Sequence, residues 1–336
     1  MPLFHDIGEK PKRVIAGIPT VSGRDLQLYK ISYTGNGPTS TDHTQFSLLQ
    51  ESNMNLNRAI NNKTTMDLKI KGKTAVITGG DSGMGLATAK ILASEGVNIV
   101  LSDKTHEELE KAAEEVRAQA KNDSKVIAIS ADLTINGEVL KLADQTKAEF
   151  GGADMLVNCA GIRGAAGDFL NLSDEDWYTS IDVDLMGAVR VCRAFIPQMQ
   201  EKKWGRIVLI ASENAMQSYE EESPYNACKA GIVNLTNCLT RAYAREGLMI
   251  NCVSPAYVAT PMTDAMMDQL AKERNSSKEE AIQWFLKNKR PNIVVDRRGK
   301  PEEVAAVIAF LCSEHVSYVT GSNYRVDGGA VGTAFG

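Results

Sequence analysis

Short apolar runs alternate with longer helical patterns along most of the chain, and this alternation restricts the possible folds more than any other feature. The runs that predict strands span residues 74–78, 98–102, 125–130, 154–158, 206–211, 249–253 and 323–326. Most are continuous stretches of Val, Ile and Leu, as is typical of strands buried on both faces of a sheet. Helical patterns lie between them, near 83–95, 105–121, 136–150, 174–200, 224–246, 264–289 and 301–313. The sequence therefore predicts an α/β fold with a doubly wound, seven-stranded parallel sheet and helices on both faces.

Residues 1–65 differ in composition from the rest of the chain. They are rich in Asn, Thr, Ser and Gly and show no long periodicity. We expect an N-terminal extension over 1–65 that is flexible or loosely docked, followed by a single domain over 66–336. Met66, at the change in composition, is a candidate for an alternative or the true start of translation.

Charge and residue types exclude several classes of protein. The net charge is −5 and no basic patch dominates, so we expect no nucleic-acid partner. The apolar runs are shorter than the roughly 20 residues of a membrane span, and the first residues do not resemble a signal peptide. The 6 cysteines form no C-x-x-C pair and the 4 histidines form no cluster. We therefore expect a cytoplasmic protein with buried free thiols, no membrane association and no metal site.

The first predicted strand ends in a glycine-rich turn that leads into a helix. Glycines let backbone N–H groups approach a pyrophosphate, and the N-terminus of the helix adds positive potential. The turn therefore predicts a dinucleotide site that includes Thr78, Gly79, Ser82, Gly83, Met84 and Gly85.

The second predicted strand ends at Asp103, 18 residues after Gly85. A carboxylate at this place can accept hydrogen bonds from both ribose hydroxyls of NAD and would repel the 2′-phosphate of NADP. We therefore expect NAD as the cofactor rather than NADP, with the adjacent Lys104 as a residue that could soften the discrimination.

A second motif, Y-x-x-x-K, is formed by Tyr225 and Lys229, which share one face of a predicted helix. The ammonium of Lys229, together with a positive nicotinamide ring, favours the phenolate of Tyr225. Tyr225 can then accept the proton of an alcohol or return it to a carbonyl. Ser212 ends an apolar run 13 residues before Tyr225, and its hydroxyl can hydrogen-bond the substrate oxygen.

The spacing T-G-x-x-x-G-x-G, followed in order by Asp103, Ser212, Tyr225 and Lys229, resembles the short-chain dehydrogenase/reductase family, in the subgroup that includes 3-oxoacyl reductases. The resemblance implies a Rossmann-type fold and an NAD-dependent oxidoreductase that moves a hydride between nicotinamide and an alcohol or carbonyl substrate. It also implies a homotetramer that pairs through the helices at 174–200 and 224–246.

The same resemblance implies further contacts with the cofactor. Lys229 is implied to hold the nicotinamide ribose, in addition to its effect on Tyr225. The other implied contacts are Asp132 and Leu133 at the adenine, Asn158, Ala160 and Gly161 after the fourth strand, and Pro255, Val258 and Thr260 at the nicotinamide.

The chain departs from the family pattern at Cys159, at Ala256 and above all at Asp184, which stands where Asn is usual. The family's Asn is implied to kink its helix and to bind a water that links Lys229 to solvent. An ionised Asp accepts hydrogen bonds but cannot donate them. Asp184 is therefore a candidate catalytic residue that either keeps this relay with a different pH dependence or lowers the activity.

The substrate is expected to be a small-molecule alcohol or ketone, and acyl thioesters, sugars or polyols, and steroids all remain open. Arg163 is a candidate to face an anionic substrate, with an ordinary surface position as the alternative. The acidic run 220–222 is a candidate for the rim of the cleft entrance, although a solvated loop is the preferred interpretation. Candidates for the substrate cleft, equally consistent with ordinary core, are Met262, Met266, Met267, Trp284 and Phe285.

Two other classes of function compete with the enzyme. One is a catalytically weak dinucleotide-binding or sensing protein of the same fold, which the intact Ser212, Tyr225 and Lys229 disfavour. The other is an interaction protein that uses residues 1–65.

Overall fold

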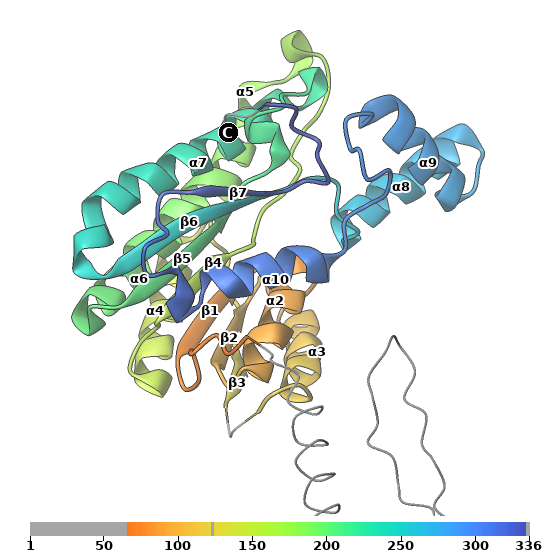
Figure 1. Cartoon of the computed structure of the whole chain (residues 1–336). Coiled ribbons are helices and arrows are strands. Elements are labelled where there is room, and N and C mark those ends of the chain that lie inside the picture. The colour runs from red at the N-terminus through yellow and green to blue at the C-terminus, as the bar shows by residue number, and fades with distance from the viewer. Residues whose placement is uncertain (1–65, 122–123, 334–336) are drawn as a thin grey trace, which may run out of the picture. The chain divides into compact units, whose positions relative to one another are not determined.

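The computed structural model describes residues 66–121 and 124–333 (Figure 1). The expectation for residues 1–65 lies outside the described residues. Strands of the described part form one parallel sheet in the order β3-β2-β1-β4-β5-β6-β7, which confirms the predicted sheet. The strands are β1 (Thr74–Thr78), β2 (Asn98–Ser102), β3 (Val126–Ala128), β4 (Met155–Asn158), β5 (Gly205–Ile210), β6 (Leu248–Pro255) and β7 (Asn323–Val326).

Helices cover both faces of the sheet (Figure 1). One face packs against α2 (Gly83–Ser94), α3 (His106–Arg117) and α10 (Pro301–Leu311). The other packs against α4 (Asn136–Phe150), α6 (Gly187–Lys202) and α7 (Ser223–Tyr243). The remaining helices are α5 (Asp174–Ser180), α8 (Pro261–Arg274) and α9 (Lys278–Lys289).

Successive residues of the central strands enter two different cores. Ile77 and Ile99 belong to the core beneath α2, α3 and α10, whereas Val76 and Val100 belong to the core beneath α4, α6 and α7. All four side chains are completely buried. A strand covered on both faces needs an apolar residue at every position, which explains why the sequence shows continuous rather than alternating apolar runs.

Two long helical predictions differ from the structure. The segment 264–289 is not one helix, because Asn275 ends α8 in a left-handed conformation with φ of 51°. The side chain of Ser277 then accepts a hydrogen bond from the Glu280 N–H and starts α9 with a capping box. The segment 174–200 is helical throughout, but a π-helical turn, Ile181–Met186, separates α5 from α6.

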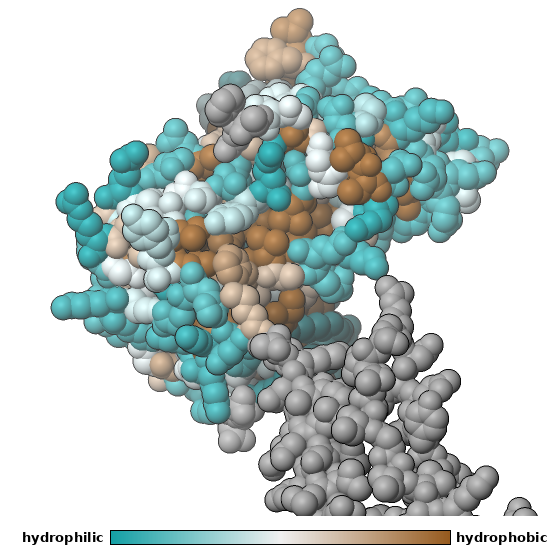
Figure 2. Space-filling view, in the orientation of Figure 1, coloured by the Kyte–Doolittle hydropathy of each residue, from teal (hydrophilic) through white to brown (hydrophobic). Residues whose placement is uncertain are grey.

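The helices α8 and α9 carry a small core of their own. Met267, Phe285 and Leu286 pack there with Tyr257, which follows β6. Figure 2 shows hydrophilic side chains over the outer surface of these two helices and hydrophobic ones gathered at the centre of the same face of the molecule. Over residues 66–121 and 124–333, no helix combines the length and the apolar character needed to cross a membrane.

The strand order fixes where a ligand can bind. From β1 the chain builds outward through β2 to β3 and then returns to place β4 on the other side of β1. Helices therefore leave the neighbouring ends of β1 and β4 toward opposite faces, and a crevice opens at the carboxyl ends of these strands.

Candidate active site

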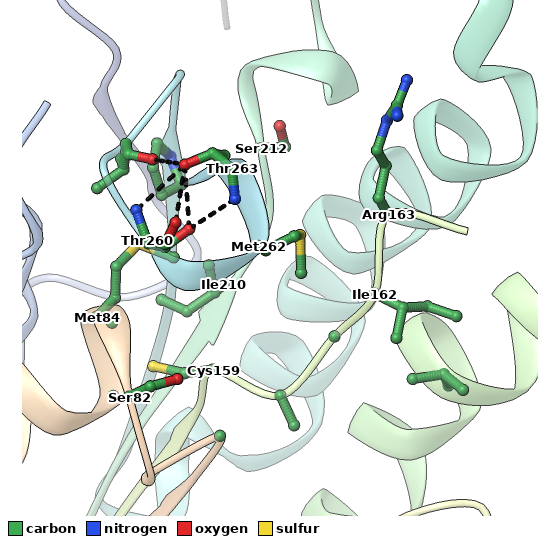
Figure 3. Close-up of a pocket in the computed structure, with 18 of the residues that line it drawn as sticks. Ser82, Met84, Cys159, Ile162, Arg163, Ile210, Ser212, Thr260, Met262 and Thr263 are labelled. Carbon is green, nitrogen blue, oxygen red and sulfur yellow. Dashed lines mark hydrogen bonds between the residues drawn. The ribbon is translucent and has the colours of Figure 1, made fainter. Parts of the chain in front are cut away.

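A pocket lies at the carboxyl ends of the strands, and most of the predicted site residues line it. Figure 3 shows Ser82 and Cys159 at one end of this pocket and Ser212, Met262 and Arg163 toward the other. Of the predicted catalytic and cofactor-binding residues, Asn158 and Asp184 do not line it. The predicted residues that do are Thr78, Gly79, Ser82, Gly83, Met84, Gly85, Asp103, Asp132, Leu133, Ala160, Gly161, Ser212, Tyr225, Lys229, Pro255, Val258 and Thr260.

The glycine-rich turn after β1 is folded so tightly that side chains are excluded from it. A Cβ placed on Gly85 would lie 2.0 Å from the carbonyl oxygen of Gly79. Gly79 itself has a φ of +64°, and a Cβ there would lie 2.6 Å from the backbone nitrogen of Ala160. The turn therefore presents backbone to the pocket at the N-terminus of α2, which is the arrangement that fits the phosphates of a dinucleotide.

Asn158 lies beneath the residues that line the pocket and is not one of them. Its Oδ1 accepts a hydrogen bond of 2.8 Å from the Thr78 hydroxyl, and both side chains are buried. This bond joins the ends of β1 and β4 beneath the glycine-rich turn. Asn158 therefore has a structural role, whereas the implied contact with the cofactor would require it to line the pocket.

We call the part of the pocket formed by the glycine-rich turn and the turn after β4 the dinucleotide half. Two acidic residues, Asp103 and Asp132, lie at its far end. Asp103 accepts a hydrogen bond of 2.6 Å from the Lys104 N–H, and burial raises the pKa of its carboxyl. The Lys104 ammonium lies 3.0 Å from Asp132. Desolvation raises the pKa of Asp132, but hydrogen bonds from Thr134 and Lys104 outweigh it, so the pKa is lowered. Asp103 thus presents an acceptor to the pocket while Lys104 is paired with Asp132.

The structure brings Ser212, Tyr225 and Lys229 together at the opposite half. Ser212 follows β5, whereas Tyr225 and Lys229 lie one turn apart on α7. The Lys229 ammonium lies 5.3 Å from the centre of the Tyr225 ring and donates a hydrogen bond of 3.3 Å to the Ile210 carbonyl. All three residues line the pocket, as the order of motifs in the sequence predicts.

Lys229 lowers the pKa of Tyr225, as expected, but other groups around the phenol act in the opposite direction. Burial raises the pKa of the phenol, and the carboxylates of Asp184 and Glu213 raise it further. Lys229 and a hydrogen bond with Ser212 lower it, but these effects are outweighed and the net pKa is raised. The phenol is therefore held in the protonated form that can donate a proton.

Asp184 lies in the π-helical turn, directly behind Lys229. Its Oδ1 accepts a hydrogen bond of 3.0 Å from the Ile162 N–H and lies 3.4 Å from the Lys229 ammonium. The side chain is 1% exposed, and its Oδ2 has no hydrogen-bond partner among the described residues. Burial lowers the pKa of Lys229, but Asp184 and Tyr225 outweigh that effect and raise it. Asp184 therefore keeps Lys229 charged.

The expected apolar lining is only partly correct. Met262, Met266 and Phe285 line the pocket. Met267 is instead buried in the core of α8 and α9, and Trp284 stacks against Arg274, whose guanidinium carbon lies 4.0 Å from the ring centre.

The acidic run before α7 differs from the preferred expectation of a solvated loop. Glu222 is 8% exposed and lines the pocket. It is bound by Arg290, which follows α9, at 3.0 Å. Arg163, which also lines the pocket, lies 3.7 Å from the same carboxylate. Glu221 is exposed and pairs with Lys289, so it does behave as a surface residue.

Sequence reasoning missed a buried charged cluster beside Ser212, formed by Glu213, Asn214, Glu222 and Arg290. Glu213 accepts a hydrogen bond of 2.7 Å from the Ser212 hydroxyl and lies 3.7 Å from the Arg290 guanidinium. Burial raises the pKa of Glu213 to about 7. Adjacency to Ser212 could have drawn attention to Glu213 and Asn214, whereas no local pattern marks Arg290. Elsewhere in the described part of the chain, as here, no group of three or more His, Cys, Asp or Glu side chains is placed to hold a metal ion.

Comparison with known proteins agrees with this geometry. A family model described as enoyl-(acyl carrier protein) reductase matches residues 79–331. The oxidoreductase UcpA of Salmonella typhimurium is 35% identical over 263 residues, which cover 78% of this chain and 95% of that protein. The D-beta-hydroxybutyrate dehydrogenase of Cupriavidus necator is 33% identical, covering 78% of this chain and 99% of that protein.

A solved structure supports the same assignment. The L-sorbose reductase of Gluconobacter frateurii, crystallised with NADPH and L-sorbose, is 33% identical with a TM-score of 0.75, covering 80% of this chain and all of that one. The family match extends over most of the described residues, including the glycine-rich turn, Ser212, Tyr225 and Lys229. The chain therefore belongs to the short-chain dehydrogenase/reductase family, whose members bind a nicotinamide dinucleotide.

Proposed function

We propose that this protein is an NAD-dependent oxidoreductase that interconverts an alcohol and a carbonyl compound, with Tyr225 as the acid/base. The observation that carries the proposal is the meeting of Ser212, Tyr225 and Lys229 at one wall of the pocket whose other half is the glycine-rich turn. A bound nicotinamide supplies or accepts the hydride in this chemistry.

The chain's own residues then handle the substrate oxygen and its proton. Ser212 donates a hydrogen bond to the oxygen, and Tyr225 gives a proton to a carbonyl or takes one from an alcohol. Lys229, kept charged by Asp184, stabilises the phenolate that remains after Tyr225 gives up its proton. The same ammonium would hold the nicotinamide ribose.

We favour NAD because Asp103 presents an acceptor where the adenosine ribose would lie. Lys104, the adjacent cation, is paired with Asp132 and is therefore less free to bind a 2′-phosphate. The L-sorbose reductase was crystallised with NADPH, so relatives of this fold do use the phosphorylated cofactor. Kinetics with both cofactors at equal concentration decide the preference.

The carbonyl compounds to be tested as substrates form a panel chosen from the similar proteins. A hydroxy-acid dehydrogenase and a ketose reductase are among the similar proteins, so 3-oxo acids and ketoses come first, followed by acyl thioesters and steroid ketones. We also propose that residues 66–336 act as one catalytic domain and that the protein assembles as a homotetramer. Light scattering of the full chain and of a chain that starts at Met66 tests both points.

The central test compares wild type with Tyr225→Phe. We expect unchanged NADH binding, measured by fluorescence, and a roughly thousandfold loss of ketone reduction, because the phenolic proton is removed. Tyr178→Phe is the control, since Tyr178 is exposed and does not line the pocket. Wild-type turnover by Tyr225→Phe would contradict the proposal. Binding without turnover across the whole panel would instead favour a dinucleotide-sensing protein.

A further inference from the structure

A buried carboxyl group directly follows the serine that faces the substrate. Glu213 begins a 3₁₀ turn after Ser212, is 4% exposed and lines the pocket. Its Oε2 accepts a hydrogen bond of 2.7 Å from the Ser212 hydroxyl. A buried carboxylate loses much of its hydration, so its hydrogen bonds decide which protonation state it prefers. Glu213 and Ser212 therefore form a coupled pair.

The single hydrogen of the Ser212 hydroxyl has competing acceptors. Besides Glu213, the Asn214 Oδ1 lies 3.0 Å from the Ser212 oxygen. The same oxygen accepts a hydrogen bond of 3.2 Å from the Asn214 N–H. A hydroxyl has only one hydrogen to donate. While that hydrogen points to the Glu213 carboxylate, it is not available to the oxygen of a substrate.

We propose that Glu213 is a positioning residue that sets the direction of the Ser212 hydrogen. With its carboxyl protonated, Glu213 donates to the Ser212 oxygen, and the serine hydrogen can turn from the neutral Asn214 Oδ1 to the substrate carbonyl. With its carboxyl ionised, Glu213 accepts that hydrogen and withdraws it from the substrate. The inference rests on the proposed function. The proton of Glu213 is not consumed, because the proton that enters the product comes from Tyr225.

The charged and titratable groups around Glu213 set the pH at which its carboxyl loses its proton. Burial raises the pKa of Glu213 to about 7, with a further rise from Glu222, while the Ser212 hydrogen bond and Arg290 lower it. Tyr219 and Tyr225 also face it, and its charge raises the pKa of both phenols. Ketone reduction should therefore fall as the pH rises through about 7.

Replacing Glu213 with Gln tests the direction of the hydrogen bond. Arg290 lies 3.7 Å from Oε1, so it would attract the amide oxygen of Gln and turn the amide N–H toward Ser212. Glu213→Gln should therefore behave like the protonated form at every pH. We expect the step near pH 7 to vanish from the profile of kcat/KM, and reduction at pH 8 to exceed wild type by about tenfold, since a group of pKa 7 is about one-tenth protonated there.

Glu222→Gln is the matched control in the same cluster. Its carboxylate binds Arg290 and Asn214 but makes no recorded contact with Ser212. Because the charge of Glu222 raises the pKa of Glu213, the step should remain and move to lower pH. A step near pH 7 that persists in Glu213→Gln would overturn the proposal, because the group responsible would then lie elsewhere.

A second readout is independent of turnover. The titration of Glu213 can be followed by NMR in the full chain with ¹³C-labelled Glu carboxyl groups, its signal assigned by its absence in Glu213→Gln. Ser212→Ala removes the donor that stabilises the ionised form, so the pKa of Glu213 should rise. An unchanged titration would overturn the pairing. Absence of any turnover by wild type would instead contradict the proposed function and leave this titration standing.

Discussion

The two halves of the pocket are built by different means. The dinucleotide half consists mainly of backbone and small side chains in the two turns that follow β1 and β4, each formed by a short continuous stretch of sequence, with Asp103 and Asp132 at its far end. The substrate half holds buried charges, Glu213, Glu222 and Arg290, which come from three separate segments of the chain. A half made of backbone has one fixed shape, whereas a half made of paired charges has properties that depend on pH and on each partner.

The largest effect on stability should come from removing the cation of the substrate half. Arg290→Met leaves Glu213 and Glu222 without their shared partner, and we expect unfolding free energy at pH 8 to fall by about 3 kcal/mol. The loss should be smaller at pH 5, where Glu213, with a pKa of about 7, is protonated and needs no counter-charge. Denaturant unfolding measures both values.

Lys289→Met is the control for this change, because Lys289 makes an exposed pair with Glu221. Loss of this exposed pair should lower the free energy of unfolding by less than about 1 kcal/mol. NADH affinity should stay the same in Arg290→Met. Equal losses of stability in the two variants, or a large loss of NADH affinity, would show that the two halves are not distinct.

The next effect tests the fixed shape of the dinucleotide half. Gly85→Ala would place a Cβ 2.0 Å from the Gly79 carbonyl oxygen, so the turn must move. We expect NADH affinity to fall about 30-fold, which corresponds to about 2 kcal/mol of strain. Gly137→Ala, where no atom lies within 4 Å of the added Cβ, should leave affinity unchanged. Normal affinity in Gly85→Ala would show that the turn is pliable.

Asp103→Ala should have a smaller effect and one confined to cofactor choice. On the proposed function, this change removes the acceptor for the ribose hydroxyls and the charge that would repel a 2′-phosphate. We expect the KM for NAD to rise about tenfold and NADP to compete, because about one charge-assisted hydrogen-bonded contact is lost. Steady-state kinetics with each cofactor measure this. Unchanged NAD kinetics would remove Asp103 from the cofactor site.

The smallest effect on rate is expected from Asp184→Asn, a change at a residue that lies behind Lys229 and outside the pocket lining. Asn keeps the shape and restores the family's usual residue, so activity should stay within about tenfold. Because the Asp184 charge raises the pKa of Tyr225, its removal should lower that pKa. The rise of alcohol oxidation with pH should then occur at lower pH. A complete loss of activity would show that the carboxylate has a role of its own.

Local patterns in the sequence were sufficient to predict the sheet and most of the residues that line the pocket. The strands at 74–78, 98–102 and 323–326 match β1, β2 and β7 residue for residue. Each predicted cofactor residue except Asn158 lines the pocket. Short-range signals sufficed because strand burial, the glycine-rich turn and the i, i+4 spacing of Tyr225 and Lys229 all act within a few residues.

Other features depended on contacts that no local pattern contains. The break between α8 and α9 is the exception, because Asn275 and the capping box of Ser277 and Glu280 are local signals that the prediction of one continuous helix overlooked. The raised pKa of Tyr225 follows from burial and from Asp184, which a different helical turn supplies.

The sequence by itself determined the fold class and the glycine-rich turn, and it predicted that Ser212, Tyr225 and Lys229 line one site. Only the tertiary structure decided that Glu213 is buried against Ser212, that Arg290 reaches it from the end of α9, and that Asp184 lies behind Lys229. The physical reason is that periodicity and turn geometry are set by neighbouring residues, whereas desolvation and charge pairing depend on what the whole chain packs around a group.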